Sequence, residues 1–144
     1  MWFLLATVAS MFWGIFYIFS EHVYKQISVY TALAFESFFL FLVASYLAIR
    51  GGALKHDLVA LGTSGKLAVL LATITVASII AELSINFSIS EKDATLAGFV
   101  EITYPFFIAL FAYLIFGQEE LHPGTAFGGA LIFIGACTIF YFSR

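Results

Sequence analysis

Three glutamates, Glu36, Glu82 and Glu101, lie inside long apolar stretches of this sequence. A carboxyl group can bind a proton, a metal ion or an organic cation, so these side chains are the first candidates for chemistry. An ionised residue at the centre of a membrane span costs roughly 2.5–3.5 kcal/mol, and every Lys and Arg lies at or beyond the end of an apolar stretch. We therefore expect the three carboxyl groups to be protonated, hydrated or bound to a cation.

Polar side chains recur near Glu82 at helical spacing. Asn86 follows it by four residues, and Thr75 and Ser78 extend the same helical face, which should point to protein or water rather than to lipid. Judged from the midpoints of the apolar stretches, all three acids are displaced toward one membrane face, so they could share a layer. The simpler alternative is that each glutamate is structural, protonated and hydrogen-bonded between helices.

Pro105 and several aromatic residues could complete a binding site. Proline lacks an N–H, so Pro105 cannot bond the carbonyl of Glu101, and that freed carbonyl would add a second oxygen beside the Glu101 side chain. Trp13, Tyr17 and Tyr104 could hold an organic cation against their ring faces. The alternatives are a plain kink at Pro105 and rings that pack or face lipid, since the chain contains 18 phenylalanines.

Five long apolar runs must position these residues. The chain of 144 residues is 62% hydrophobic and 10% charged, which excludes a water-soluble domain. A bilayer core about 30 Å thick needs about 20 mostly apolar residues per helix. The runs that meet this need are residues 2–20, 26–49, 67–90, 94–118 and 121–143. We predict an all-α, multi-pass membrane protein of the plasma membrane, a bundle of five transmembrane helices forming a single domain over residues 1–144. The one long connection is expected to hold a short surface helix around residues 57–61.

The last run and the loop charges bear on assembly. Gly124 and Gly128 form a GxxxG pair, and Gly135 follows seven residues later on nearly the same face, which favours close packing of a helix from this chain or a partner. With five spans, the loops and termini place three Lys and Arg residues on each side of the membrane: Arg50, Lys55 and Lys66 against Lys25, Lys92 and Arg144. This balance either reflects a weak signal from short loops or means that both orientations insert and two copies pair antiparallel.

Several short motifs carry a family resemblance. They are Trp13-Gly14, Pro105, Phe116-Gly117-Gln118-Glu119, Gly128-Gly129-Ala130-Leu131-Ile132 and Gly135-Ala136. In these motifs and in helix order the chain resembles the drug/metabolite transporter superfamily, and more closely its EamA-like five-helix unit. That resemblance implies secondary export or uptake of small solutes by two units of inverted topology. Because one unit is present here, it implies an inverted (antiparallel) homodimer or pairing with a related inverted chain.

These features together predict a secondary active transporter of a small solute, coupled to protons or another cation. Glu101 and Glu82 would alternate between protonated and cation-bound states, Asn86 would supply a neutral oxygen, and Glu36 would complete the site or relay. Desolvation and a neighbouring carboxylate both favour the protonated form of a carboxyl group, so protons can compete with substrate. The expected partners are the lipid bilayer and a small-molecule or cationic substrate.

Two other classes of function remain open. Carboxylate and amide oxygens also suit hard divalent cations, so a passive divalent-cation pathway is one alternative. The other is a non-transporting membrane subunit whose glutamates only pack helices. An enzyme is not expected, because no nucleophile–base pair or phosphate loop appears in any span, and neither a cofactor nor a resident metal is expected. The net charge of −3, with scattered basic residues, offers no surface for nucleic acid.

Overall fold

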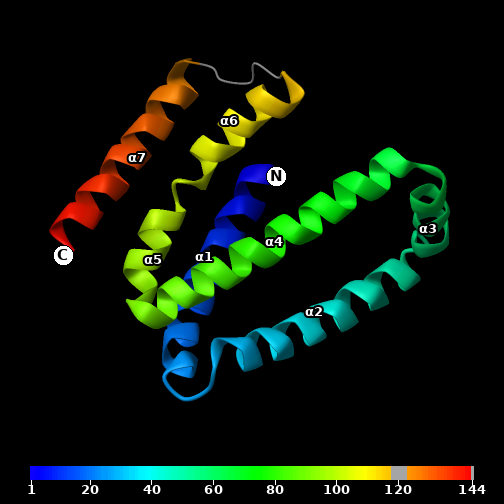
Figure 1. Cartoon of the computed structure of the whole chain (residues 1–144), viewed down its shortest axis with the longest axis horizontal. Helices are drawn as coiled ribbons and strands as arrows, with labels where there is room; N and C mark the ends of the chain where they lie inside the picture. Colours follow the sequence, from blue (N-terminus) through cyan, green and yellow to red (C-terminus); the bar gives the residue numbers. More distant parts are fainter. Residues whose placement is uncertain (118–122, 144) are drawn as a thin grey trace. The chain divides into compact units, whose positions relative to one another are not determined.

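The computed structural model describes residues 1–117 and 123–143, and over these residues the chain forms helices and turns without any strand. The helices follow one another along the chain (Figure 1). They are α1 Trp2–Tyr24, α2 Val29–Arg50, α3 Leu54–Thr63, α4 Gly65–Glu91, α5 Ala94–Glu101, α6 Tyr104–Phe116 and α7 Pro123–Phe142. Contacts divide the chain into two compact units: residues 1–22 with 88–144, and residues 23–87.

Four stretches of the described chain are long and apolar enough to cross a membrane. They are α1, α2, α4, and α5 together with α6, and they correspond to the first four predicted spans. The apolar part of α7, Ala126–Phe142 among the described residues, is shorter. The all-helical membrane class is therefore confirmed, whereas the fifth span stays a prediction. Its start at residue 121, like the predicted end of the fourth span at residue 118, lies outside the described residues.

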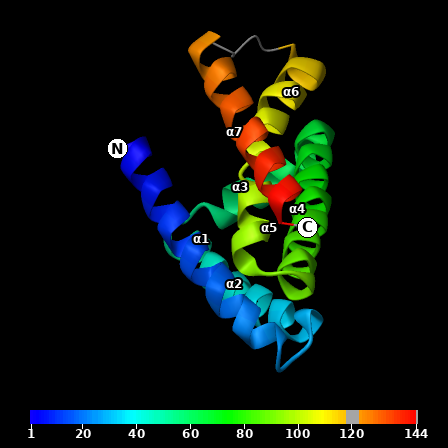
Figure 2. The ribbon, with the colours of Figure 1, turned by 90° about the vertical axis from the view of Figure 1, so that its left-hand side faces the viewer.

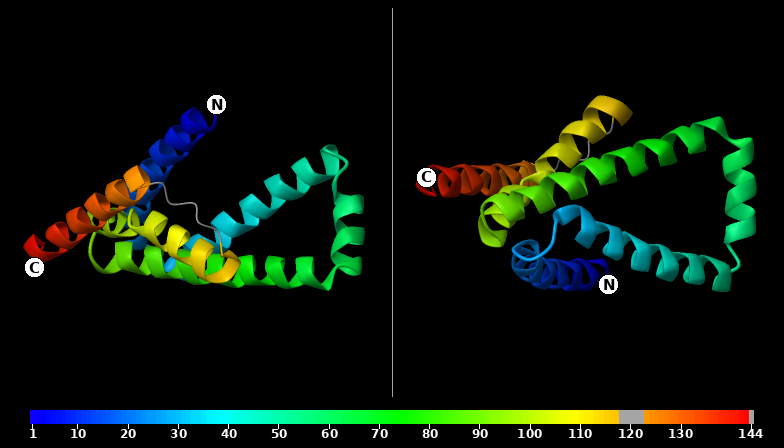
Figure 3. Two further views of the ribbon diagram at one scale, coloured as in Figure 1. Left: turned by 90° about the horizontal axis from the view of Figure 1, so that it is seen from above. Right: turned by 60° about the horizontal axis from the view of Figure 1, so that its bottom comes forward.

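Residues 23–87 form the unit built from α2, α3 and most of α4. The Ser28 side chain caps α2 by accepting a hydrogen bond from the Thr31 N–H at 3.2 Å, so α2 begins at Val29 rather than at residue 26. The rings of Tyr30 and Phe87, 5.3 Å apart, join α2 to α4. At the other ends of these helices, α3 bridges from one to the other (Figure 3). The short helix expected at residues 57–61 is thus present and extends beyond those bounds.

The second unit contains α1 up to residue 22, the end of α4, and α5, α6 and α7. Both α5 and α6 pack against α7 (Figure 2), and the rings of Phe106 and Phe133 meet at 5.7 Å in the α6–α7 contact. Lys92, just before α5, donates a hydrogen bond from Nζ to the Ser143 carbonyl at 3.3 Å. These contacts join the start of α5 and the start of α6 to the last helix.

The predicted fourth span is interrupted rather than continuous. Its first part, α5, ends at Glu101, and α6 begins at Tyr104 with Pro105 in its first turn. Proline costs little at that position, because the first N–H groups of a helix have no intrahelical acceptor. A turn links the two parts, in which the Phe106 N–H donates to the Thr103 carbonyl at 3.0 Å. The interruption places Glu101 at a helix end inside an apolar segment.

Candidate functional site

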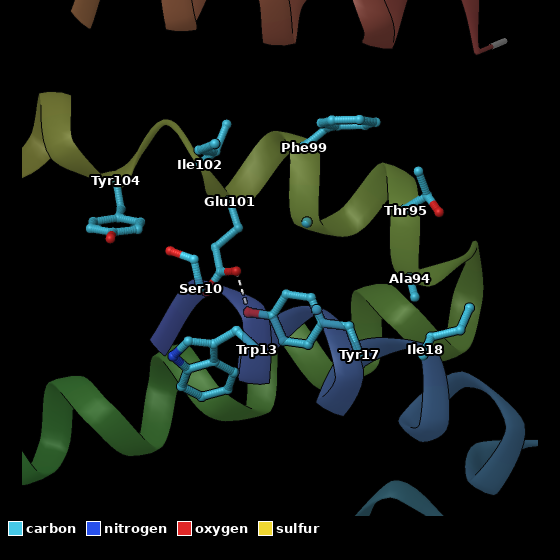
Figure 4. A pocket seen from close by; sticks show the side chains of 12 residues that line it. Ser10, Trp13, Tyr17, Ile18, Ala94, Thr95, Phe99, Glu101, Ile102 and Tyr104 are labelled. Carbon is cyan, nitrogen blue, oxygen red and sulfur yellow. Dashed lines mark hydrogen bonds between the residues drawn. The ribbon is translucent and has the colours of Figure 1, made fainter. Parts of the chain in front are cut away.

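The first pocket lies between α1 and α5 in the unit formed by residues 1–22 and 88–144. It has a volume of about 570 Å³. Figure 4 shows Glu101 reaching from the end of α5 toward Tyr17 on α1, with Trp13 and Tyr104 nearby. The complete lining is Ser10, Trp13, Gly14, Tyr17, Ile18, Ala94, Thr95, Gly98, Phe99, Glu101, Ile102 and Tyr104. Of the residues expected at a binding site, four therefore meet here: Trp13, Tyr17, Glu101 and Tyr104.

A hydrogen bond between Tyr17 and Glu101 is the central polar contact of this pocket. The Tyr17 hydroxyl donates to Oε2 of Glu101 (Figure 4). Tyr17 is buried, with 8% of its surface exposed, and Glu101 is half-buried. The Trp13 ring lies one turn earlier on α1, with its centroid 5.6 Å from that of Tyr17. The carboxyl group of Glu101 thus has one hydroxyl donor and a neighbouring aromatic wall.

Two features of the backbone set this arrangement. A Cβ added at Gly98 would lie 3.4 Å from Cδ2 of Tyr17, so the absence of a side chain on this face of α5 lets the Tyr17 ring come close. One turn further along α1, Glu21 accepts a hydrogen bond from the Ala94 N–H at 3.0 Å. Asp93 caps the same helix by accepting from the Leu96 N–H at 2.7 Å. Two carboxylates therefore stabilise the positive end of α5 and fix its start against α1.

A second pocket, of about 430 Å³, lies between α2 and α4 in the unit of residues 23–87. Glu36 and Glu82 both line it, and both are half-buried. The other lining residues are Tyr30, Leu33, Ala34, Ser37, Leu40, Ser78, Ile79 and Leu83. Two of the three predicted acids are therefore brought to one pocket.

Asn86 supports Glu82 from the next turn of α4. It is fully buried, and its Nδ2 donates to the Glu82 carbonyl at 2.9 Å and, more distantly, to Oε2 at 3.4 Å. Its Oδ1 accepts a hydrogen bond from the Tyr24 hydroxyl. The amide oxygen that was expected to face a cation is thus already bonded to a tyrosine. The amide nitrogen, rather than the oxygen, is directed to the acid.

The remaining predicted positions fall as follows. The Thr75 and Ser78 hydroxyls donate to carbonyls of their own helix, at 2.9 and 3.0 Å. Gly128 and Gly135 on α7 are half-exposed, with open space where a Cβ would lie, and Gly124 is exposed. Their role in helix packing stays a prediction.

The shared layer of all three acids also stays a prediction, because Glu101 belongs to one unit and Glu36 and Glu82 to the other.

Sequence reasoning missed three residues that shape these sites. Glu21 follows Tyr17 by four residues, and this spacing, which puts both on the same helical face, is the signal that could have found it. The sequence carries no signal for the contact of Gly98 with the Tyr17 ring or for that of Tyr24 with Asn86. Over the ranges that the structure describes, no group of three or more His, Cys, Asp or Glu side chains could hold a metal ion.

Long apolar helices that enclose carboxyl groups in pockets define an integral, multi-pass membrane protein. The chain matches the model of the EamA-like transporter family over residues 1–141, and it belongs to that family. No curated protein and no solved structure matches the chain. The resemblance inferred from short motifs is confirmed. Membership indicates a membrane transporter of small solutes in a lipid environment, since the members of this family are transporters.

Proposed function

We propose that this EamA-like protein is a secondary active transporter that couples movement of a small solute to protons or another cation through its intramembrane glutamates. The observation that carries the proposal is the Tyr17–Glu101 contact inside the α1–α5 pocket. A carboxyl group in such a place can be neutralised by a proton or by a bound cation, but both together would leave a net charge. Exchange of protons for a cation across the membrane requires that the two do not bind this carboxyl group at the same time.

The α2–α4 pocket supplies the second acidic centre of this proposal. Glu36 and Glu82 line the same pocket, so a proton held by one reduces the repulsion between them. Asn86 donates to Glu82 and orients it, which replaces the expected role of Asn86 as an oxygen ligand. In the proposed cycle Glu101 and Glu82 alternate between protonated and cation-bound states. Glu36 either relays a proton or completes the second acidic centre.

Assembly completes the proposed function. Five spans would place the chain ends on opposite sides of the membrane, so two oppositely inserted copies would form an antiparallel homodimer in the plasma membrane. A related inverted chain could take the place of one copy. The open space beside Gly128 and Gly135 supports close approach by a helix of such a partner.

Flux in reconstituted liposomes under a pH gradient tests the coupling. The Glu101→Gln, Glu82→Gln double variant should abolish gradient-driven flux, because neither glutamine can release a proton. Glu91→Gln is the matched control, since Glu91 is exposed and lines neither pocket. Unchanged flux in the double variant would remove the proposed mechanism.

A passive divalent-cation pathway is the second candidate, and the shared pocket of Glu36 and Glu82 favours it. Paired carboxylates attract hard cations such as Mg²⁺ or Mn²⁺. This candidate requires Mn²⁺ to raise the unfolding temperature of the wild type and not that of a Glu36→Gln, Glu82→Gln variant. It also requires metal flux that responds to voltage without moving protons.

A further inference from the structure

We propose that the transported substrate is a monovalent organic cation with an apolar, ring-containing body, and that it binds in the α1–α5 pocket by taking the place of the Tyr17 hydroxyl on Glu101. This inference rests on the proposed function and names its substrate class. Within the proposed cycle, the cation that alternates with a proton on Glu101 is the substrate itself.

The charge of the pocket selects the charge of the ligand. Among the described residues that line it, Glu101 is the only one with a formally charged side chain. A ligand of charge +1 pairs with an ionised Glu101 and leaves a neutral site. An anion, or a cation of charge +2, would leave an uncompensated charge in a largely apolar cavity, which is strongly unfavourable.

The walls select an organic cation over a metal ion. The rings of Trp13, Tyr17 and Tyr104 lie on the side of the pocket to which Glu101 points (Figure 4), and aromatic faces attract organic cations most strongly where water is excluded. Metal ions such as Mg²⁺ and Ca²⁺ instead require about six to eight oxygen ligands, mostly from carboxylates, carbonyls and water. The volume of about 570 Å³ falls in the range typical of pockets for drug-sized molecules.

Tyr17 acts as an internal competitor for the carboxyl group. Its hydroxyl donates a hydrogen bond to Oε2 of Glu101, while its ring forms part of the wall and packs over Gly98. A cation that pairs closely with Glu101 must displace this donor or share the carboxylate with it. Tyr17→Phe removes the competing hydroxyl and keeps the ring, so it should tighten binding, whereas a purely structural hydroxyl would weaken it when removed.

Two probes of the same shape and opposite charge test the assignment. Tetraphenylphosphonium carries +1 and tetraphenylborate carries −1. Equilibrium binding of each is measured to the full chain in phosphatidylcholine nanodiscs, with empty nanodiscs as the background. We expect saturable binding of the phosphonium alone. Its affinity should fall at least about tenfold in Glu101→Gln, the loss of one charge-assisted contact. Affinity should be partly retained in Glu101→Asp, rise in Tyr17→Phe and stay unchanged in Glu91→Gln.

Equal binding of the borate and the phosphonium to the wild type would overturn the assignment, as would unchanged phosphonium affinity in Glu101→Gln. If Glu101→Gln fails to fold, the wild-type comparison of the two probes and the direction of the Tyr17→Phe effect decide the question. Failure of the proposed function looks different. Glu101-dependent phosphonium binding without proton-driven flux would remove secondary transport and keep the ligand assignment. Proton-driven flux of an uncharged solute, without Glu101-dependent cation binding, would remove the ligand assignment and keep secondary transport.

Discussion

Glu21 on α1 accepts a hydrogen bond from the backbone N–H of Ala94, the first residue of α5, at 3.0 Å. This contact fixes the start of α5 against α1. Glu101 ends the same short helix, about two turns later, and meets Tyr17, which precedes Glu21 by one turn of α1. The position of the Glu101 carboxyl group therefore depends on an acid outside the pocket.

Replacing Glu21 by Ala should destabilise the protein and weaken cation binding together. Loss of a charge-assisted bond at a helix N-terminus costs about 1–2 kcal/mol, and α5 would lose its anchor on α1. Glu21→Gln should be milder, because its amide oxygen can still accept from Ala94. Thermal unfolding in detergent and phosphonium affinity measure the two effects. Equal stability of Glu21→Ala, Glu91→Gln and the wild type would show that this contact contributes nothing.

Gly98 should tolerate a methyl group but not a branched side chain. An added Cβ sits 3.4 Å from the Tyr17 ring, ordinary contact at the tight end of the range, so Gly98→Ala should bind cations nearly as the wild type does. Gly98→Val adds two methyl groups in the same place, which should displace the ring and cost about 1–3 kcal/mol. A reduced phosphonium affinity is expected.

Gly62 provides the control for this series. It lies on α3, with open space where a Cβ would be, so Gly62→Val tests the general cost of valine in a helix. If Gly98→Val binds and unfolds like Gly62→Val, then Tyr17 does not depend on the small residue beneath its ring.

Asn86 should be among the most sensitive positions outside the α1–α5 pocket. It is fully buried and bonds Tyr24 on one side and Glu82 on the other. Asn86→Ala removes both hydrogen bonds, and each contributes about 0.5–1.5 kcal/mol to stability. We expect a lowered unfolding temperature and impaired coupling. Ser84→Ala is the control, because the exposed Ser84 hydroxyl bonds only a carbonyl of its own helix, and that variant should be close to neutral.

The helices and the local pairs were accessible from the sequence, whereas the contacts between helices were not. The apolar runs fix where spans occur, the four-residue spacing puts Asn86 beside Glu82, and Pro105 marks the region where α5 gives way to α6. The Tyr17–Glu101 contact joins residues 84 positions apart. No periodic signal predicts it, because most residues of α1 and α5 are apolar and packing between helices in lipid depends on close steric fit.

The inverted dimer predicts that the chain inserts in both orientations. Reporters fused to the carboxyl terminus, one active only on each side of the membrane, should therefore both be active. Adding two lysines beside Lys92 should shift activity to one reporter, because positive loops remain on the cytoplasmic side. A homodimer that needs both orientations should also lose flux in this variant. Lysines added beside Lys55 should bias insertion the opposite way, and co-expression of the two variants should restore flux. Activity of a single reporter in the wild type would exclude a dual-topology homodimer and leave a partner chain to supply the inverted unit.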